Sequence, residues 1–198
     1  MRVAINGFGR IGKLVFRAFL EQNIKNVEIV AINELGSLDS SYHLLKFDSA
    51  HGQLAKKISK TAKSLKYNNK IIQFFSEKNP KNLPWKQLKI DVVLECSGAF
   101  TTKEESEAHI LSGAKKVIIS APAKNVDATI VQGVNNNVLD KKHNIISNGS
   151  CTTNCLAPIA MILDKTIGIK SGFMTTIHSF TGDQRTVDQS HSDLRRAR

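Results

Sequence analysis

Residues 2–22, RVAINGFGRIGKLVFRAFLEQ, predict the fold of the first part of this chain. RVAIN is a short apolar run typical of a strand buried in a parallel sheet. After the glycines, apolar residues recur at helical spacing from Leu14 to Phe19. A second apolar run, VEIVAIN at 27–33, follows this segment. The order strand, glycine turn, helix, strand predicts a βαβ unit.

The glycines between the first strand and the helix, Gly7, Gly9 and Gly12, form the pattern G-x-G-x-x-G. In such a turn the first glycine permits a tight bend, the second lets the backbone approach a pyrophosphate, and the third lets helix and strand pack closely. Glu34 ends the second strand about 20 residues later, where an acidic side chain can accept hydrogen bonds from an adenosine ribose. The alternative is that the three glycines serve only packing, but this alternative leaves the position of Glu34 after the second strand unexplained. We therefore predict a dinucleotide site, and Glu34 favours NAD because it would repel the 2′-phosphate of NADP.

Further strands are predicted by β-branched, apolar runs at 91–98, 115–121 and 129–135, with a helical pattern over 103–114. Alternating strands and helices indicate an α/β fold with a Rossmann-like, doubly wound parallel sheet. The lysine-rich segment before Pro80 is a candidate antiparallel excursion.

The chain is expected to enter a second domain at about residue 150. Residues 150–168 predict a helix with Ser150 as N-cap and Gly168 as its stop, and a new strand over 172–180 carries His178. The last residues, HSDLRRAR, end in a charged stretch without a helix stop signal. We expect an NAD-binding domain over 1–149 and the truncated start of an α+β catalytic domain over 150–198.

Composition places the chain among globular proteins, with 41% hydrophobic and 23% charged residues. It contains no apolar run of about 20 residues and no secretory signal, so we predict a cytoplasmic protein without a membrane partner. The net charge is +11, with lysines crowded between Lys56 and Lys70. That run has one aromatic residue, no arginine and no nucleic-acid motif, which favours a solvated surface over specific nucleic-acid binding.

The three cysteines, Cys96, Cys151 and Cys155, do not resemble a disulfide framework. The last two are not spaced as C-x-x-C, and no further cysteine pair completes a zinc site, so we expect no metal. Cys151 occupies the predicted helix start, a position that lowers the pKa of a thiol, and its neighbours are polar. Cys155 precedes an apolar run and is expected to pack as a small hydrophobe. Cys151 is the candidate nucleophile.

A cysteine nucleophile needs a base, and spacing alone does not choose among the six histidines. A lone histidine is more often structural than catalytic. His178 lies in TTIHSFTGDQ, 175–184, a predicted strand running into a polar loop. Such a position presents an imidazole at a domain junction, so His178 is the candidate base.

Five segments together carry a family resemblance, in order and spacing: AINGFGRIG (4–12), ISAPA (119–123), SCTTNCLAP (150–158), TTIHSFTGDQ (175–184) and DLRRAR (193–198). Over its whole length the chain resembles the N-terminal part of phosphorylating glyceraldehyde-3-phosphate dehydrogenase. The resemblance implies an oxidoreductase of glycolysis that converts glyceraldehyde 3-phosphate, inorganic phosphate and NAD to 1,3-bisphosphoglycerate. It also implies a homotetramer.

The same resemblance assigns roles to residues. Cys151 would form a thiohemiacetal and then a thioester, and His178 would accept the proton. The residues implied for phosphate binding are Ser150, Thr152, Thr181 and Arg198. Those implied for the cofactor, besides the glycines and Glu34, are Arg10 and Ile11 along the pyrophosphate, Lys78 near the adenine and Ser120 near the nicotinamide ribose.

The chain departs from the family pattern in three places. Glu34 stands where many members have aspartate, a form also seen in erythrose-4-phosphate dehydrogenase, whereas Thr181 favours the triose-phosphate enzyme. Gln189 and Ser190 stand where NAD-restricted members commonly have Leu-Pro, which leaves NADP use open. Members also extend well past Arg198, so little activity is expected of these 198 residues alone. The alternatives are erythrose-4-phosphate dehydrogenase and a basic dinucleotide-fold module that binds RNA or another partner.

Overall fold

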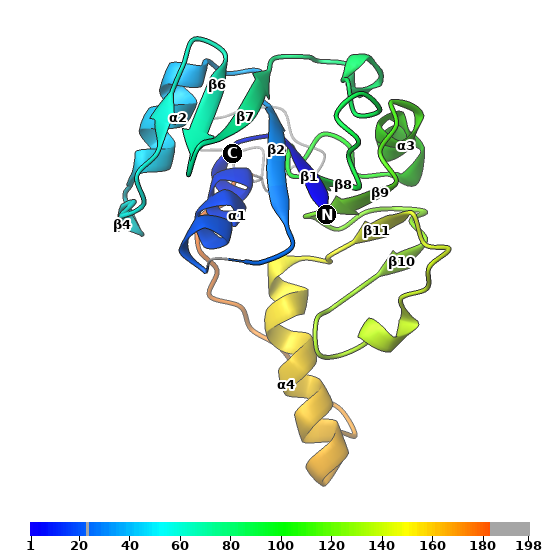
Figure 1. Cartoon of the computed structure of the whole chain (residues 1–198). Coiled ribbons are helices and arrows are strands. Elements are labelled where there is room, and N and C mark those ends of the chain that lie inside the picture. The colour runs from blue at the N-terminus through cyan, green and yellow to red at the C-terminus, as the bar shows by residue number, and fades with distance from the viewer. Residues whose placement is uncertain (23, 183–198) are drawn as a thin grey trace, which may run out of the picture. The chain divides into compact units, whose positions relative to one another are not determined.

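The computed structural model describes residues 1–22 and 24–182. The chain divides into two compact units, Met1–Ile162 and Leu163–Arg198. Within the described residues, nine strands of the first unit form one sheet, in the order β10-β11-β9-β8-β1-β2-β7-β6-β5 (Figure 1). Their bounds are β1 Arg2–Asn6, β2 Glu28–Asn33, β5 Ser59–Lys60, β6 Ser64–Tyr67, β7 Lys70–Phe75, β8 Val92–Glu95, β9 Lys116–Ile119, β10 Ala128–Thr129 and β11 Ile145–Ser147.

The pairing of these strands is parallel except at one end of the sheet. β1 pairs in parallel with both β2 and β8, and the parallel pairing extends to β7 on one side and to β9, β11 and β10 on the other. β6 pairs antiparallel with both β5 and β7, which confirms the antiparallel excursion predicted for the lysine-rich segment. β3 (Phe47–Asp48) and β4 (Gly52–Gln53) form a separate antiparallel pair.

The helices within residues 1–22 and 24–182 are α1 (Arg10–Glu21), α2 (Leu38–Lys46), α3 (Lys103–Leu111) and α4 (Cys151–Ile167), with single 3₁₀ turns η1 (Pro80–Asn82) and η2 (Asn136–Val138). Side-chain caps mark the start of two of these helices: Ser37 caps α2, and Thr102 forms a capping box with Glu105 at α3. In Figure 1, α1 lies beside the β2 half of the sheet and α3 beside the β9 half.

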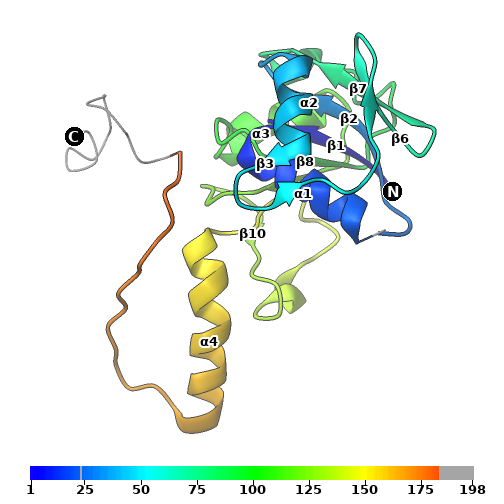
Figure 2. The same ribbon diagram turned by 90° about the vertical axis from the view of Figure 1, so that its left-hand side faces the viewer.

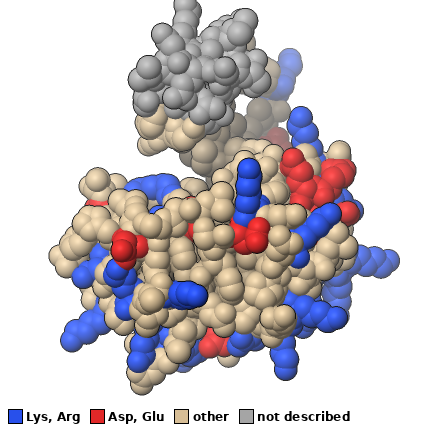
Figure 3. Space-filling view, turned by 90° about the horizontal axis from the view of Figure 1, so that it is seen from above, with Lys and Arg blue, Asp and Glu red and all other residues tan. Residues whose placement is uncertain are grey.

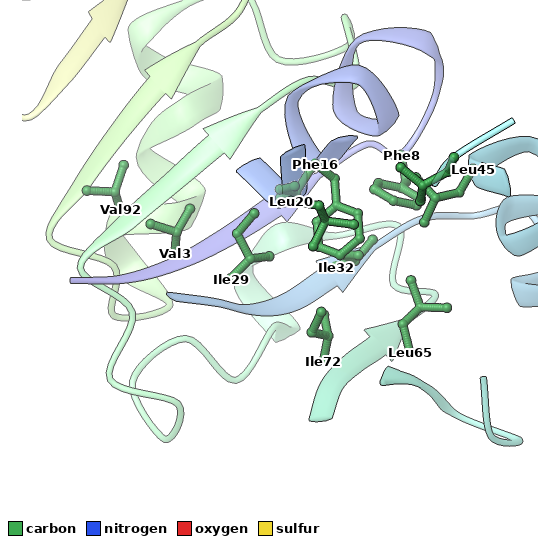
Figure 4. Packing of buried hydrophobic residues seen from close by; sticks show 12 residues of the cluster. Val3, Phe8, Phe16, Leu20, Ile29, Ile32, Leu45, Leu65, Ile72 and Val92 are labelled. Carbon is green, nitrogen blue, oxygen red and sulfur yellow. The ribbon is translucent and has the colours of Figure 1, made fainter. Parts of the chain in front are cut away.

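The sheet is covered by apolar side chains on both faces. Along β1, Val3 and Ile5 belong to one buried cluster and Ala4 to the other, because successive side chains of a strand point to opposite faces. Phe16 and Leu20 of α1 belong to the first cluster and lie close to Ile32 of β2 (Figure 4). The second cluster gathers Trp85, Ile90, Val93 and Val117, with Ile110 of α3 packed against it. This two-sided core confirms the predicted doubly wound α/β fold.

One predicted strand is largely wrong. Of residues 129–135, only Thr129 belongs to a strand, β10. The side chain of Asn135 accepts a hydrogen bond from Val131 N–H at 2.7 Å and donates one to the Thr129 carbonyl at 2.9 Å, and Gly133 has φ +83°. The chain therefore turns immediately after Thr129, since the asparagine supplies partners that a strand neighbour would otherwise provide.

The strand predicted over 172–180 is also absent from the described structure, in which these residues form neither helix nor strand. Phe173 and Ile177 are fully exposed there. A strand requires hydrogen bonds from a neighbouring strand, and the described part of the second unit, 163–182, contains none.

The surface carries charges of both signs. On the face shown in Figure 3, Lys and Arg side chains project from many places and Asp and Glu side chains lie among them. No helix within the described residues is long and apolar enough to cross a membrane.

Phe16 tests the first cluster. Its side chain is fully buried, and its ring meets that of Phe8 edge-to-face at 5.8 Å. We expect Phe16→Ala to lower the free energy of unfolding of this chain by about 3–5 kcal/mol, because it removes a buried ring and leaves a cavity. Phe173→Ala, at a fully exposed site, should change it by less than about 0.5 kcal/mol. Urea unfolding followed by circular dichroism measures both, and equal effects would contradict the assignment of this core.

Candidate functional site

The predicted cofactor residues follow the carboxyl ends of parallel strands. Gly7 follows β1, Glu34 follows β2, Lys78 lies beyond the end of β7, and Ser120 follows β9. Parallel neighbours end at the same edge of a sheet, so these positions share one edge. The chain moves from β1 to β2 on one side, whereas β8 lies on the other side of β1. The loops after β1 and β8 therefore diverge, and such a switch point is where open α/β sheets bind ligands.

A cavity of about 610 Å³ lies at this switch point. Four predicted residues line it: Gly7, Gly9, Glu34 and Lys78. The other lining residues are Asn6, Asn33, Leu35, Glu77, Cys96, Ser97, Ala99 and Phe100. The tertiary structure thus brings together the glycine turn, the acidic residue and Lys78, which are far apart in sequence.

The three glycines differ in the space around them. A Cβ atom at Gly7, which has φ +84°, would lie 2.4 Å from Cα of Ser97, and one at Gly12 would lie 2.2 Å from the carbonyl oxygen of Gly7. Neither position admits a side chain. Beyond Gly9 and its two chain neighbours, no heavy atom lies within 4 Å of the Cβ position of Gly9, and Gly9 is the N-cap of α1 without a side-chain cap bond. An open, side-chain-free helix N-terminus suits a phosphate group.

Glu34 holds the glycine turn as well as lining the cavity. Its Oε2 accepts a hydrogen bond from Phe8 N–H at 2.6 Å, and its Oε1 accepts one from Gly36 N–H at 3.0 Å. A carboxylate has about four acceptor positions, so acceptor capacity remains for a ligand hydroxyl. The sequence predicted a ribose contact, and the structure adds this anchoring of the turn.

Four predicted cofactor residues are not among those lining the cavity: Arg10, Ile11, Gly12 and Ser120. The Arg10 guanidinium forms an ion pair with Asp48, Nη1 to Oδ2 2.5 Å. Asp48 accepts hydrogen bonds that hold the pKa of its carboxyl well below the usual range, and the bond from the His51 backbone N–H has the largest effect. Ile11 is exposed, and Ser120 donates its backbone N–H to the Glu95 carbonyl at 2.9 Å.

Cys96 is the cysteine of the cavity wall. Burial raises the pKa of its thiol to about 11, while a hydrogen bond with the Ser120 side chain acts in the opposite direction. A thiol with that pKa carries almost no thiolate near neutral pH. Cys96 therefore does not compete as a nucleophile.

Cys151 is the first residue of α4, which follows the loop after β11 and runs uninterrupted to Ile167 (Figure 2). The Ser150 hydroxyl accepts a hydrogen bond from Thr153 N–H at 2.9 Å, which confirms the predicted N-cap. Cys151 is exposed, and Thr152 is half-buried.

The expectation that Cys155 packs inside is wrong for this structure, where Cys155 is exposed. No residue of α4 is buried, although Ile159, Ile162 and Leu163 are large and apolar. The described residues bury α4 only in part, so Cys155 stays exposed although its apolar sequence context indicated packing.

The remaining predicted residues belong to the second unit. His178 is exposed, with Nδ1 2.6 Å from the Ser179 carbonyl oxygen, and Thr181 is half-buried. Arg198, Gln189 and Ser190 lie outside the described residues. Within residues 1–22 and 24–182, no group of three His, Cys, Asp or Glu side chains is arranged to hold a metal ion.

Sequence reasoning missed most of the cavity wall. Asn6 and Asn33 are the last residues of their strands, and Cys96 and Ser97 follow β8 directly. Their common signal is a position at the carboxyl end of a predicted parallel strand. The ends of these strands can be predicted from the sequence, but the strand order, which places β8 beside β1, cannot.

The chain is similar to known proteins over its full length. Residues 1–103 match the family model described as "Glyceraldehyde 3-phosphate dehydrogenase, NAD binding domain", and residues 150–198 match "Glyceraldehyde 3-phosphate dehydrogenase, C-terminal domain". The chain is 54% identical to glyceraldehyde-3-phosphate dehydrogenase 2 of Streptomyces avermitilis, 53% to the glyceraldehyde-3-phosphate dehydrogenase of Mycoplasma pneumoniae and 52% to that of Geobacillus stearothermophilus.

These alignments cover 100% of this chain and 58–59% of the three relatives. The chain thus spans less than two thirds of their length. The comparisons confirm the resemblance read from the sequence, and they do not favour the erythrose-4-phosphate or RNA-binding alternatives. The chain belongs to the glyceraldehyde-3-phosphate dehydrogenase family, and its first 103 residues match that family's NAD-binding domain.

Proposed function

We propose that this chain is the cofactor-binding and nucleophile-bearing part of a phosphorylating glyceraldehyde-3-phosphate dehydrogenase. The reaction oxidises glyceraldehyde 3-phosphate with NAD and inorganic phosphate and yields 1,3-bisphosphoglycerate. The observation that carries the proposal is the cavity at the switch point, lined by Gly7, Gly9, Glu34 and Lys78, in a chain of this family. Cys151 follows the last strand of the same parallel sheet and begins a helix.

The cavity suits a dinucleotide. The open space above Gly9 and the helix N-terminus without a side-chain cap suit a pyrophosphate, with Arg10 and Ile11 beginning that helix. Glu34 lies on the wall where it can accept from ribose hydroxyls, and Lys78 would lie near the adenine. Ser120, beyond β9, would contact the nicotinamide ribose. When bound, NAD supplies the acceptor for the hydride.

Cys151 performs the covalent chemistry in this proposal. Its thiolate sulfur adds to the aldehyde carbon to form a thiohemiacetal, and His178 takes the hydroxyl proton as the carbon loses its hydride. The resulting thioester is attacked by inorganic phosphate, which forms the acyl phosphate and releases the Cys151 thiolate. Ser150, Thr152, Thr181 and Arg198 would hold the phosphate groups.

The cofactor preference, the assembly and the domain boundary belong to the same proposal. A carboxylate at Glu34 favours NAD over NADP, whereas Gln189 and Ser190 leave secondary NADP use open. We infer a homotetramer in the cytoplasm, with an NAD-binding domain over 1–149 and a catalytic domain that begins at 150. The family models support a division of this kind, because the C-terminal model begins to match at residue 150.

Gly9→Ala tests the cofactor site. The new methyl group meets no atom within 4 Å outside residue 9 and its chain neighbours, so folding should be retained, but the methyl group occupies space that the pyrophosphate needs. We expect the dissociation constant for NAD, measured by calorimetry on this chain, to rise at least about tenfold. Gly172→Ala, whose added methyl also meets nothing within 4 Å, should leave it unchanged. Unaltered affinity in Gly9→Ala would argue against this placement of the pyrophosphate.

Thiol labelling tests the choice of nucleophile. With iodoacetamide at pH 8, Cys151 should react faster than Cys155, which is also exposed, because the Cys151 thiol lies at a helix N-terminus. Cys96 should react slowest, with a rate that rises about tenfold per pH unit until its pKa of about 11. Mass spectrometry of digested protein locates the label. Equal rates for Cys151 and Cys155 would remove the support for an activated thiol.

Activity tests the reaction itself and needs the protein with a complete catalytic domain. Cys151→Ser should lower NADH formation from glyceraldehyde 3-phosphate by about a thousandfold or more, because the hydroxyl is far less nucleophilic than a thiolate. Cys155→Ser should retain activity within a few-fold. Full activity of Cys151→Ser, or a strong preference for erythrose 4-phosphate as substrate, would overturn the proposal.

A further inference from the structure

A chain of buried polar side chains lies behind the cofactor cavity. Its members are Trp85, His109, Glu95, Asn6 and Asn33, each no more than 5% exposed. They come from β1, β2, β8, α3 and the segment after η1, so the chain of bonds connects both halves of the sheet. Buried polar groups are stable only when they bond one another, and no side-chain polar atom buried within the described residues lacks a partner.

One end of this chain of bonds is set by the indole. Trp85 Nε1 lies 3.0 Å from His109 Nδ1, and an indole N–H can only donate. His109 Nδ1 is therefore the acceptor and the imidazole carries its proton on Nε2. That N–H donates to Glu95 Oε2 at 2.9 Å. The contact between His109 and Glu95 is thus a hydrogen bond of fixed direction.

The other end is set by the backbone of Glu77. Its N–H donates to Asn33 Oδ1 at 2.8 Å, and its carbonyl accepts from Asn33 Nδ2 at 2.8 Å, which fixes the orientation of that amide. Asn33 Nδ2 also donates to Asn6 Oδ1 at 2.7 Å. Asn6 must then present its Nδ2 to Glu95 Oε2, at 2.6 Å.

The second oxygen of Glu95 holds the turn after β8. Oε1 accepts from Ser97 N–H at 2.8 Å and from the Ser97 hydroxyl at 2.5 Å. The same hydroxyl accepts from Ala99 N–H at 3.1 Å, across Gly98 with φ +73°. One carboxylate thus receives four donors, two from the β1 and α3 side and two from the turn.

We propose that Glu95 is a positioning residue for the cofactor cavity: its carboxylate holds both the Asn6–Asn33 wall and the turn at Ser97 in place without itself lining the cavity. Asn6, Asn33, Glu77 and Ser97 all line that cavity, whereas Glu95 does not. The inference deepens the proposed NAD-binding function and rests on it.

The side chain at position 95 must present a hydrogen-bond acceptor at both of its terminal atoms, because donors face each of them. A glutamine at position 95 would place an NH₂ group against either the Ser97 N–H or the donors of Asn6 and His109. Neither of those donors can reverse, because the Glu77 backbone and the Trp85 indole fix them from the far side. The NH₂ group of the glutamine would then face another buried donor, and the Asn6–Asn33 wall or the turn at Ser97 would lose the hydrogen bond that holds it in place.

The first experiment compares Glu95→Gln with Glu107→Gln in this chain. Glu107 is exposed on α3, so its substitution removes the same charge from the surface. We expect the dissociation constant for NAD, by calorimetry, to rise about tenfold in Glu95→Gln and to stay unchanged in Glu107→Gln. Far-ultraviolet circular dichroism establishes that each variant is folded.

The second experiment acts through His109, which does not line the cavity. His109→Leu removes the donor to Glu95, whereas His109→Gln keeps an N–H near the Nε2 position. NAD affinity should fall several-fold in the leucine variant and be largely retained in the glutamine variant. Trp85 is the one tryptophan in the sequence, so its emission reports the network directly and should shift in His109→Leu.

The outcomes separate the two ideas. If the unaltered chain binds no NAD, the proposed cofactor function fails and this inference fails with it. If the unaltered chain binds NAD and folded Glu95→Gln binds it equally well, the function stands and the inference is overturned. If Glu95→Gln does not fold, the His109 pair decides: equal NAD affinity of the leucine variant and the unaltered chain overturns the positioning role, and selective loss in that variant supports it.

Discussion

The cofactor cavity depends on a close approach between the glycine turn and the loop after β8. A side chain at Gly7 would collide with the backbone of Ser97, and one at Gly12 would collide with the Gly7 carbonyl. Gly7 also donates its backbone N–H to the Asn33 carbonyl at 2.9 Å, so the turn is tied to β2 on its other side. Because β1 lies between β2 and β8, these contacts set the distance between the walls at the switch point.

Polar residues replace apolar ones where the strands reach this edge. Val3, Ala4 and Ile5 of β1 are buried among apolar side chains, and Asn6 then ends the strand. Buried at the end of an apolar strand, Asn6 costs free energy unless its amide is fully bonded. Asn33 and Glu95 end their strands in the same way, and hydrogen bonds among the three residues, together with those to the Glu77 backbone, Ser97 and His109, satisfy them. The polarity that a ligand site needs is thereby accommodated beside a core.

The predictable parts of the fold were those with a local physical cause. The strand at 2–6, the helix after the glycines, the capped helices at 103 and 151 and the antiparallel excursion follow from apolar period, caps and turn residues. The strand over 129–135 was wrong because the Asn135 amide forms a turn that an apolar run does not reveal. The strand over 172–180 and the packing of Cys155 were wrong because both require partners that the described residues do not supply. The roles of Cys151, His178 and the phosphate-binding residues stay predictions.

The sequence by itself determined the strand, glycine turn and helix, the acidic residue after the second strand and a cysteine at a helix start. Each of these depends on near neighbours in the chain: side-chain period, an absent Cβ atom, a serine cap. Only the tertiary structure decided which polar residues meet. Asn6 and Glu95 are 89 positions apart, and they touch because β8 pairs with β1 in a register that places Asn6 opposite Glu95. A long crossover connection sets no such register, so the packing of the two sheet faces decides it.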